Sequence, residues 1–261
     1  MSEPLLSIHN LTLSLREEGG KRILLKRFNL KVDPFKIVAL VGLSGSGKTT
    51  VALSVLRLLS EAFQIEEGQI LFKKENLLNA GTQEMRRLRG KAIGMVFQEP
   101  LNAFNPVFPV GFQIGEVLRV HTSLSSQQIR TRIIQLLEMV GVPDPLRVMQ
   151  SFPHQLSGGL RQRAMIAQAI AASPSLMIAD EPTSNLDVTL QAHIMDLFRH
   201  LKETLKISIL LITHDLGVVS HLADEVAVLS EGEIVESGSP QEILSHPQHP
   251  FTKELVGTFR G

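Results

Sequence analysis

The sequence predicts an α/β fold with a mainly parallel sheet. Three observations lead to this prediction. The apolar, β-branched run at 37–41 is followed by a glycine-rich loop and then by a helical pattern of apolar residues. Further strand-like runs at 176–179 and 207–212 alternate with helical segments. Strands that alternate with helices along a chain favour a parallel sheet covered by helices.

The N-terminal third carries a second kind of strand pattern. Leu11, Leu13 and Leu15 alternate with polar residues, as in a half-buried strand. A glycine-containing turn at 17–21 follows, and 23–32 continues as a further strand. This predicts an N-terminal antiparallel β subdomain. Short strands are also expected at 68–72 and 93–97, and a helix is expected to follow the glycine loop, with the apolar residues Val51, Leu53, Val55, Leu56, Leu58 and Leu59.

The middle of the chain is predicted to be helical. Prolines punctuate 100–109, and the pattern from Val110 to about Phe152 is helical with few strand signals. We therefore expect an inserted helical subdomain at 107–153, within a core made of 1–106 and 154–261. Two short strands at 226–229 and 233–236 flank a turn near the C-terminus.

The composition narrows the class of protein. The chain has 261 residues, a formal net charge of zero and no cysteine. The sequence therefore predicts no disulfide frame and no zinc–thiolate site, and the neutral charge gives no sign of nucleic-acid binding. No apolar run reaches the roughly 18 residues that a membrane helix needs, and the N-terminus does not resemble a signal peptide. We expect a protein that does not span a membrane, although it could dock on one that does.

The glycine-rich loop is the most specific motif. Gly42 to Thr49 reads G-x-x-x-x-G-K-T, the pattern of a phosphate-binding P-loop. Glycines let backbone N–H groups curl around phosphate oxygens at a helix N-terminus. Lys48 is expected to reach the β- and γ-phosphates, and the Thr49 hydroxyl to hold Mg²⁺. The phosphate-binding residues are then Gly42, Ser44, Gly45, Ser46, Gly47, Lys48, Thr49 and Thr50. The alternative is a chance glycine-rich turn.

Acidic residues follow another apolar strand. The run at 176–179 ends in Asp180 and Glu181. Ligands bind beyond the carboxyl ends of parallel strands, so Asp180 is placed to hold Mg²⁺ through water. Glu181 could orient and activate the attacking water. The alternative is a solvated strand terminus.

Three further features have plain structural alternatives. Ser157, Gly158 and Gly159 precede an alanine-rich helix and predict a second anion-binding helix end, although simple helix capping also explains them. His214 follows the strand at 207–212, where a lone histidine is more often structural than catalytic. Gln98, just after the strand at 93–97, could be only a loop residue.

Taken together, these motifs resemble those of the nucleotide-binding subunit of ATP-binding-cassette (ABC) transporters over essentially the whole chain. They occur in the order of that family: Walker A at Gly42 to Thr49, a Q-loop at Gln98, the LSGG signature at Leu156 to Gly159, Walker B at Leu176 to Asp180, the catalytic glutamate Glu181, a D-loop at Ser184 to Asp187 and the switch histidine His214. The resemblance implies a P-loop NTPase core.

Longer stretches are similar to the dipeptide, oligopeptide and nickel importer subfamily. These are the extended Q-loop at 98–106, the run Pro153-His154-Gln155 before the signature, the segment 187–192, and the tail at 246–252. Many members of this subfamily continue into a longer, cysteine-containing extension, whereas this sequence contains no cysteine.

The resemblance implies an ATPase that powers solute import from the cytoplasmic face of the inner or plasma membrane, as a peripheral subunit. The implied cofactors are ATP and Mg²⁺, with Thr49, Gln98 and Asp180 as metal contacts and Glu181, His214 and Gln98 in catalysis. Two ATPase subunits, identical or different, would close head to tail, with the P-loop of one facing Ser157 to Gly159 of the other. Transmembrane permease subunits would be direct partners, and a solute-binding protein an indirect one.

Several residues depart from the family pattern. Leu15 stands at about the position where the family usually offers an aromatic that stacks on adenine, and the chain has no Tyr or Trp. We therefore expect modest ATP affinity and weak discrimination of ATP from GTP. Phe35-Lys36 replaces the usual Gly-Glu, and Leu43, Leu160 and Asn185 are also unusual.

Two other classes of function remain open from the sequence. One is an ABC ATPase of a soluble enzyme complex, of the phosphonate-degradation type. The other is a regulatory ABC protein that does not hydrolyse ATP.

Overall fold

A computed structural model describes residues 3–184 and 186–260. The chain divides into two compact units, one of residues 1–85 with 206–261 and the other of residues 86–205. We describe each by itself. Among the described residues, no helix is both long and apolar enough to cross a bilayer.

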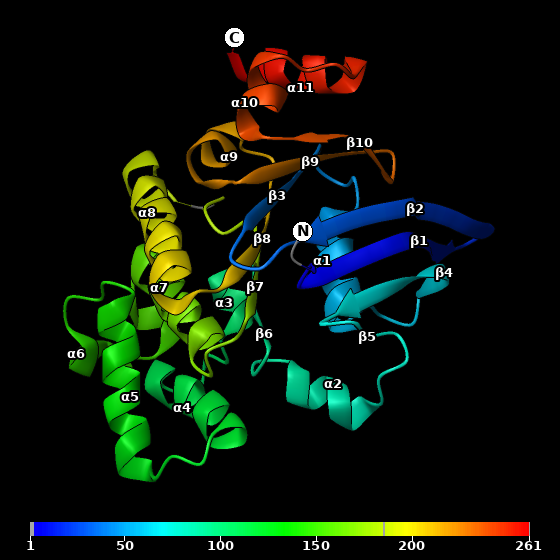
Figure 1. Ribbon diagram of the computed structural model, residues 1–261. Coiled ribbons are helices and arrows are strands. Elements are labelled where there is room, and N and C mark those ends of the chain that lie inside the picture. Colours follow the sequence, from blue (N-terminus) through cyan, green and yellow to red (C-terminus); the bar gives the residue numbers. More distant parts are fainter. Residues whose placement is uncertain (1–2, 185, 261) are drawn as a thin grey trace. The chain divides into compact units, whose positions relative to one another are not determined.

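The first unit holds two groups of strands. An antiparallel sheet has the order β2-β1-β4-β5, and a second run has the order β10-β9-β3-β8 (Figure 1). Their bounds are β1 Leu6–Glu17, β2 Gly20–Val32, β3 Ile37–Val41, β4 Phe63–Phe72, β5 Glu75–Asn76, β8 Ser208–Thr213, β9 Glu225–Ser230 and β10 Glu233–Gly238. Strand β3 pairs in parallel with both β8 and β9, whereas β10 returns antiparallel to β9. The predicted antiparallel subdomain and parallel core are confirmed.

Helices of the first unit follow these strands. They are α1 Lys48–Leu56, α2 Thr82–Leu88, which runs to the boundary with the second unit and three residues past it, α9 Leu216–Leu222, α10 Pro240–Ser245 and α11 Pro250–Arg260. Every residue of β3 and β8 is buried, as expected for central strands that are covered on both faces.

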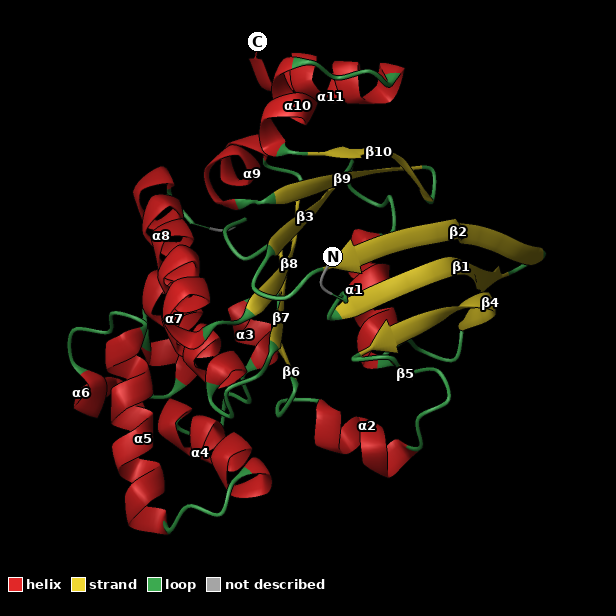
Figure 2. Cartoon of the chain, in the orientation of Figure 1, coloured by secondary structure: helices red, strands yellow, loops and turns green. Residues whose placement is uncertain are grey.

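The second unit is mostly helical (Figure 2). Strands β6 Ile93–Val96 and β7 Leu176–Asp180 pair in parallel. The helices are α3 Pro100–Ala103, α4 Val110–His121, α5 Ser126–Met139, α6 Pro145–Gln150, α7 Gly158–Ile170 and α8 Val188–Leu205, with a 3-10 turn at Pro153–Gln155. Segment 107–153 thus holds α4, α5 and α6. Whether it forms a separate subdomain stays a prediction.

Two boundaries differ from the sequence prediction. Helix α1 ends at Leu56 rather than running on to Leu59, because Arg57 adopts a left-handed conformation and the Leu58 N–H bonds back to the Leu53 carbonyl at 2.9 Å. Strand β4 begins at Phe63 rather than Gly68, because the residues before Gly68 also pair with β1. Gly68 is a mid-strand irregularity with φ 106°, where a Cβ would lie 2.6 Å from the Leu11 Cα.

Candidate nucleotide-binding site

The glycine loop lies at the end of β3 in the first unit. Gly42 follows the strand directly, and a Cβ there would lie 2.4 Å from the Leu229 carbonyl oxygen of β9, so only glycine fits without movement. Gly45 and Gly47 have φ of 79° and 104°, which glycine adopts readily. The loop is thus shaped by packing against β9 and by backbone conformations that other residues resist.

Lys48, the first residue of α1, folds back over the loop. Its Nζ donates to the carbonyls of Gly42 and Leu43, both at 2.9 Å, and the residue is only 6% exposed. An ammonium that backbone carbonyls hold over the loop is positioned to contact an anion bound there, because charge-assisted hydrogen bonds to phosphate are among the strong ones.

The N-terminus of α1 has the features of an anion cradle. Its N-cap is Gly47, which offers no side-chain cap, so no cap side chain covers the N–H groups of the first turn. The Ser46 hydroxyl is buried and has no hydrogen-bond partner among the residues that the structure describes. An unpartnered buried hydroxyl beside a helix end without a side-chain cap fits a phosphate.

The predicted switch histidine belongs to the same unit. Val41 of β3 is the register partner of Thr213 of β8, so Gly42 and His214 leave neighbouring parallel strands at the same edge. A cavity of about 280 Å³ is lined by this edge and by α11, with Gly42, Leu43, Ser44, His214, Leu216, Phe251, Glu254, Leu255 and Thr258. The structure therefore brings His214 and the P-loop together. Sequence reasoning missed the α11 side chains, because only the tertiary fold brings the tail to the loop.

In the second unit, β7 ends in the predicted carboxylates. Asp180 is 2% exposed and Glu181 is 8% exposed. Glu181 has a φ of 46°, and its carbonyl accepts hydrogen bonds from the backbone N–H and the hydroxyl of Ser184. A left-handed glutamate that is locked by the next turn is a strained residue of the kind that clusters at functional sites.

Gln98 and the signature residue Gly158 line one cavity in the same unit. It measures about 310 Å³ and is lined by Gln98, Glu99, Pro100, Leu101, Gly158, Arg161, Gln162, Pro182, Ser184 and Leu186. Gln162 of α7 is 2% exposed, and its side-chain nitrogen has no hydrogen-bond partner within the described part of the chain. Sequence reasoning missed Gln162, because no local pattern separates it from any other polar helix residue.

Ser157 caps α7, as its sequence suggested. Its hydroxyl accepts from the Leu160 N–H at 3.4 Å, a long cap. A Cβ on Gly158 would meet no atom within 4 Å, whereas one on Gly159 would touch Leu190. The side of α7 at Gly158 is therefore open. Asn185 of the D-loop lies outside the described residues.

The donor chemistry fits Mg²⁺. In the first unit Thr49 offers a hydroxyl oxygen, and in the second unit Asp180 offers a carboxylate. Each is a type of ligand that Mg²⁺ accepts in proteins together with substrate phosphates and water. Within residues 3–184 and 186–260, no cluster of three or more His, Asp or Glu side chains could hold a metal by itself. A metal bound by either residue would thus depend on the nucleotide and water for its other ligands.

Known protein families and individual proteins are similar to this chain in sequence. The family described as "ABC transporter" matches residues 25–184, and a shorter match, described as an AAA domain, covers 149–220. The chain is 43% identical over 255 residues to the oligopeptide transport ATP-binding protein OppD of Bacillus subtilis (strain 168), covering 97% of this chain and 71% of that protein. It is 42% identical to the dipeptide transport ATP-binding protein DppD of the same organism, covering 98% and 77%.

Solved structures give the same result. A bacterial ABC transporter cassette in dimeric form superimposes with a TM-score of 0.81 at 26% identity, covering 90% of this chain and 98% of that one. A cassette in a dimeric post-hydrolysis state, bound to ADP and Pi, superimposes with a TM-score of 0.80 at 27% identity and the same coverage.

Proposed function

We propose that this chain, which belongs to the ABC transporter family, energises the import of peptides. It is the ATP-binding ATPase subunit of an ABC importer. The observation that carries the peptide assignment is the 43% identity, over 97% of the chain, to an oligopeptide transport ATP-binding protein. The dipeptide relative supports peptides over nickel as the solute.

The proposed chemistry is an in-line attack of water on the γ-phosphorus of ATP. Glu181 orients that water and accepts its proton, and His214 contacts the γ-phosphate. The bond from phosphorus to the β,γ-bridging oxygen breaks, and ADP leaves. Lys48 and the N–H groups of α1 offset the charge on the transferring phosphoryl group. Thr49, Asp180 and Gln98 are the residues that would hold Mg²⁺, which would supply neutralisation of the phosphate charge.

The second subunit supplies what a single chain lacks. The open side of α7 at Gly158 fits the γ-phosphate of a nucleotide that is held by another subunit's P-loop. A related cassette has been solved as a dimer, which supports this arrangement. Whether the partner ATPase is a second copy or a different chain does not change the role of Ser157, Gly158 and Gly159.

The second unit also carries a candidate surface for the membrane partner. Val107 and Phe108 precede α4 and Phe112 lies in its first turn, and all three are exposed apolar residues. The Phe108 and Phe112 rings stack with centroids 4.8 Å apart. We assign this surface to permease contact at the cytoplasmic face of the membrane, with segment 107–153 as the helical subdomain of a core made of 1–106 and 154–261.

Co-purification and ATPase assays test this function. The tagged chain, expressed with its neighbouring subunits, should retain membrane permeases. Its ATPase rate in proteoliposomes should rise when a peptide-loaded binding protein is added. Recovery of soluble lyase subunits would assign the chain to a phosphonate-type complex, and absence of phosphate release in the assembled complex would make it a non-hydrolysing regulator.

A further inference from the structure

The antiparallel sheet carries an aromatic residue beside the position where the family pattern lacks one. Leu15, at the expected base-stacking position, is half-buried near the end of β1. Its register partner on β4 is Phe63, also half-buried. A leucine provides dispersion but no π-face, whereas its neighbour across the ladder provides one.

The ladder places these two side chains together. Arg16 donates its N–H to the Ala62 carbonyl at 2.8 Å, so the adjacent pair Leu15–Phe63 is a non-hydrogen-bonded pair. In an antiparallel ladder such pairs have the closer Cα atoms, about 4.5 Å apart, and their side chains project from the same face. Phe63 therefore flanks Leu15 on one face of the sheet.

This face turns toward the P-loop. Leu13, two residues before Leu15 and on the same face, is the register partner of Leu25. A Cβ on Gly47 would lie 3.2 Å from the Leu25 Cδ2, so the loop rests against this leucine. Leu15 and Phe63 are one pleat repeat further along, about 7 Å, a gap that the ribose of a nucleotide bridges.

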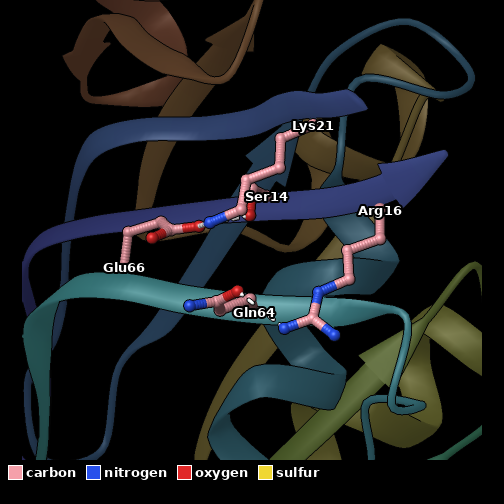
Figure 3. Close-up of polar contacts among 5 residues, drawn as sticks. All are labelled: Ser14, Arg16, Lys21, Gln64 and Glu66. Carbon is pink, nitrogen blue, oxygen red and sulfur yellow. Dashed lines mark hydrogen bonds and ion pairs between the residues drawn. The ribbon is translucent and has the colours of Figure 1, made fainter. Parts of the chain in front are cut away.

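The opposite face is already occupied by polar contacts (Figure 3). Glu66 accepts from the Ser14 hydroxyl at 2.6 Å and from Lys21 Nζ at 2.8 Å, and Arg16 donates to the Gln64 side-chain oxygen at 3.2 Å. These contacts tie β1, β2 and β4 together. The apolar face is thus left as the side of the sheet that can receive a base.

We propose that the Phe63 ring is the stacking surface for the nucleobase of bound ATP, in place of the aromatic that β1 lacks. This rests on the proposed nucleotide-binding function. Leu15 packs beside the ring and fixes its orientation. Because every base has a π-face, such a platform adds affinity without separating ATP from GTP.

A single tryptophan reports this contact directly. The chain contains no Trp or Tyr, so Phe63→Trp in the full-length protein introduces its sole indole. ATP and GTP should quench and shift its fluorescence, whereas tripolyphosphate should not. Phe35→Trp is the matched control: Phe35 is exposed in the β2–β3 turn of the same unit, and its tryptophan should not respond to nucleotide.

Affinity measurements separate the base from the phosphates. Phe63→Leu should weaken ATP and GTP binding about tenfold and leave tripolyphosphate binding unchanged, and Phe63→Tyr should restore affinity. Circular dichroism and thermal unfolding identify a variant that has lost its fold. Leu15→Tyr should strengthen ATP binding more in the Phe63→Leu background than in the wild type, since both rings serve one base.

The outcomes distinguish this inference from the function that it rests on. If ATP binds Phe63→Leu with wild-type affinity, or leaves the fluorescence of the Phe63→Trp variant unchanged, Phe63 is not the platform although the ATPase assignment stands. If Arg22→Ala instead lowers affinity for ATP but not for tripolyphosphate, the base contacts the other register partner of Leu15 and the proposal is overturned. Failure of the wild type to bind ATP or tripolyphosphate would contradict the proposed function itself.

Discussion

Helices α1 and α7 both begin beside glycines, but their N-termini are built differently. Gly47 precedes α1 without any side-chain cap, and the loop before it wraps back through the Lys48 contacts to Gly42 and Leu43. Ser157 caps α7 with its hydroxyl, and Gly158 is the first residue of that helix. The N-terminus of α1 is thus surrounded by residues of its own loop, whereas the N-terminus of α7 is exposed on the surface of its unit.

The glycines show the same contrast. A Cβ at Gly42 would collide with the Leu229 carbonyl, whereas a Cβ at Gly158 would meet nothing within 4 Å. A phosphate at α1 can be enclosed by residues of this chain alone. A phosphate at α7 needs a second surface to exclude water, because that helix end is open. The difference explains physically why a cassette with one complete P-loop would still need a partner.

The largest effect is expected from a substitution that removes the general base and leaves the N-termini of α1 and α7 unchanged. Glu181→Gln should lower the rate of phosphate release about a hundred- to ten-thousandfold, the range for loss of a general base. ATP affinity should stay the same, and size-exclusion chromatography should show a nucleotide-bound dimer. Wild-type turnover would show that Glu181 is not the base.

The next test separates the two helix ends. Ser157→Arg should reduce ATPase activity about a hundredfold by blocking the presented surface, while ATP binding to the monomer is unchanged. Lys48→Ala should instead weaken ATP binding to the monomer itself, and activity should fall with it. For both variants, equilibrium titration measures ATP binding and a phosphate-release assay measures ATPase activity.

Ser125→Arg is the matched control for the cap. Ser125 caps α5 through a complete capping box, so its replacement removes a similar helix cap elsewhere in the same unit. It should cost about 1 kcal/mol of stability and leave activity intact. Full activity from a demonstrably monomeric Ser157→Arg preparation would overturn the two-subunit site.

Alanine substitutions at Gly42 and Gly158 compare the space available around the N-termini of α1 and α7. Gly42→Ala should destabilise the protein by about 1–3 kcal/mol through overpacking against Leu229, and should also weaken ATP binding. Gly158→Ala should leave stability unchanged or raise it by less than about 1 kcal/mol, because alanine favours helix and the space is open. Urea unfolding measures both. Equal destabilisation by the two substitutions would contradict the difference in space around Gly42 and Gly158.

The smallest effect is expected from the hydrogen bonds that Glu66 accepts from Ser14 and Lys21, which connect β4 to β1 and β2. The hydrogen bond from Lys21, then that from Ser14, lowers the pKa of Glu66 below its ordinary value. A carboxyl whose folded pKa is lowered stabilises the fold above its unfolded pKa, and this contribution is lost as the pH falls through the folded pKa. Glu66→Gln should therefore destabilise slightly at neutral pH and hardly at all in acid.

Hydrogen exchange locates that effect. Because Glu66 ties together the sheet on which Gly47 rests, Glu66→Gln should reduce amide protection in β1, β2 and α1 and leave α7 unchanged. Lys21→Gln is the matched variant, and the double variant should be no worse than either single change. A uniform loss of protection in both units would show that the Glu66 hydrogen bonds do not act locally.

Local motifs were predictable from sequence. The strand at Ile37–Val41, the glycine loop and the start of α1 follow from contiguous residues whose conformations depend on their immediate neighbours. The same holds for the strand that ends at Asp180 and for the Ser157 cap. Each of these signals lies within a few residues, so the order of motifs was enough to identify the family.

Other features depend on residues that are far apart in the chain. The sequence alone determined that phosphate-binding and acidic residues stand at strand ends, because apolar strands, glycines and caps act locally. Only the tertiary structure decided that α11 lines the cavity beside His214, that β4 begins at Phe63 and that Phe63 pairs with Leu15. Strand register and the packing of a C-terminal helix result from contacts across long loops, and no local pattern specifies which residue will be opposite which.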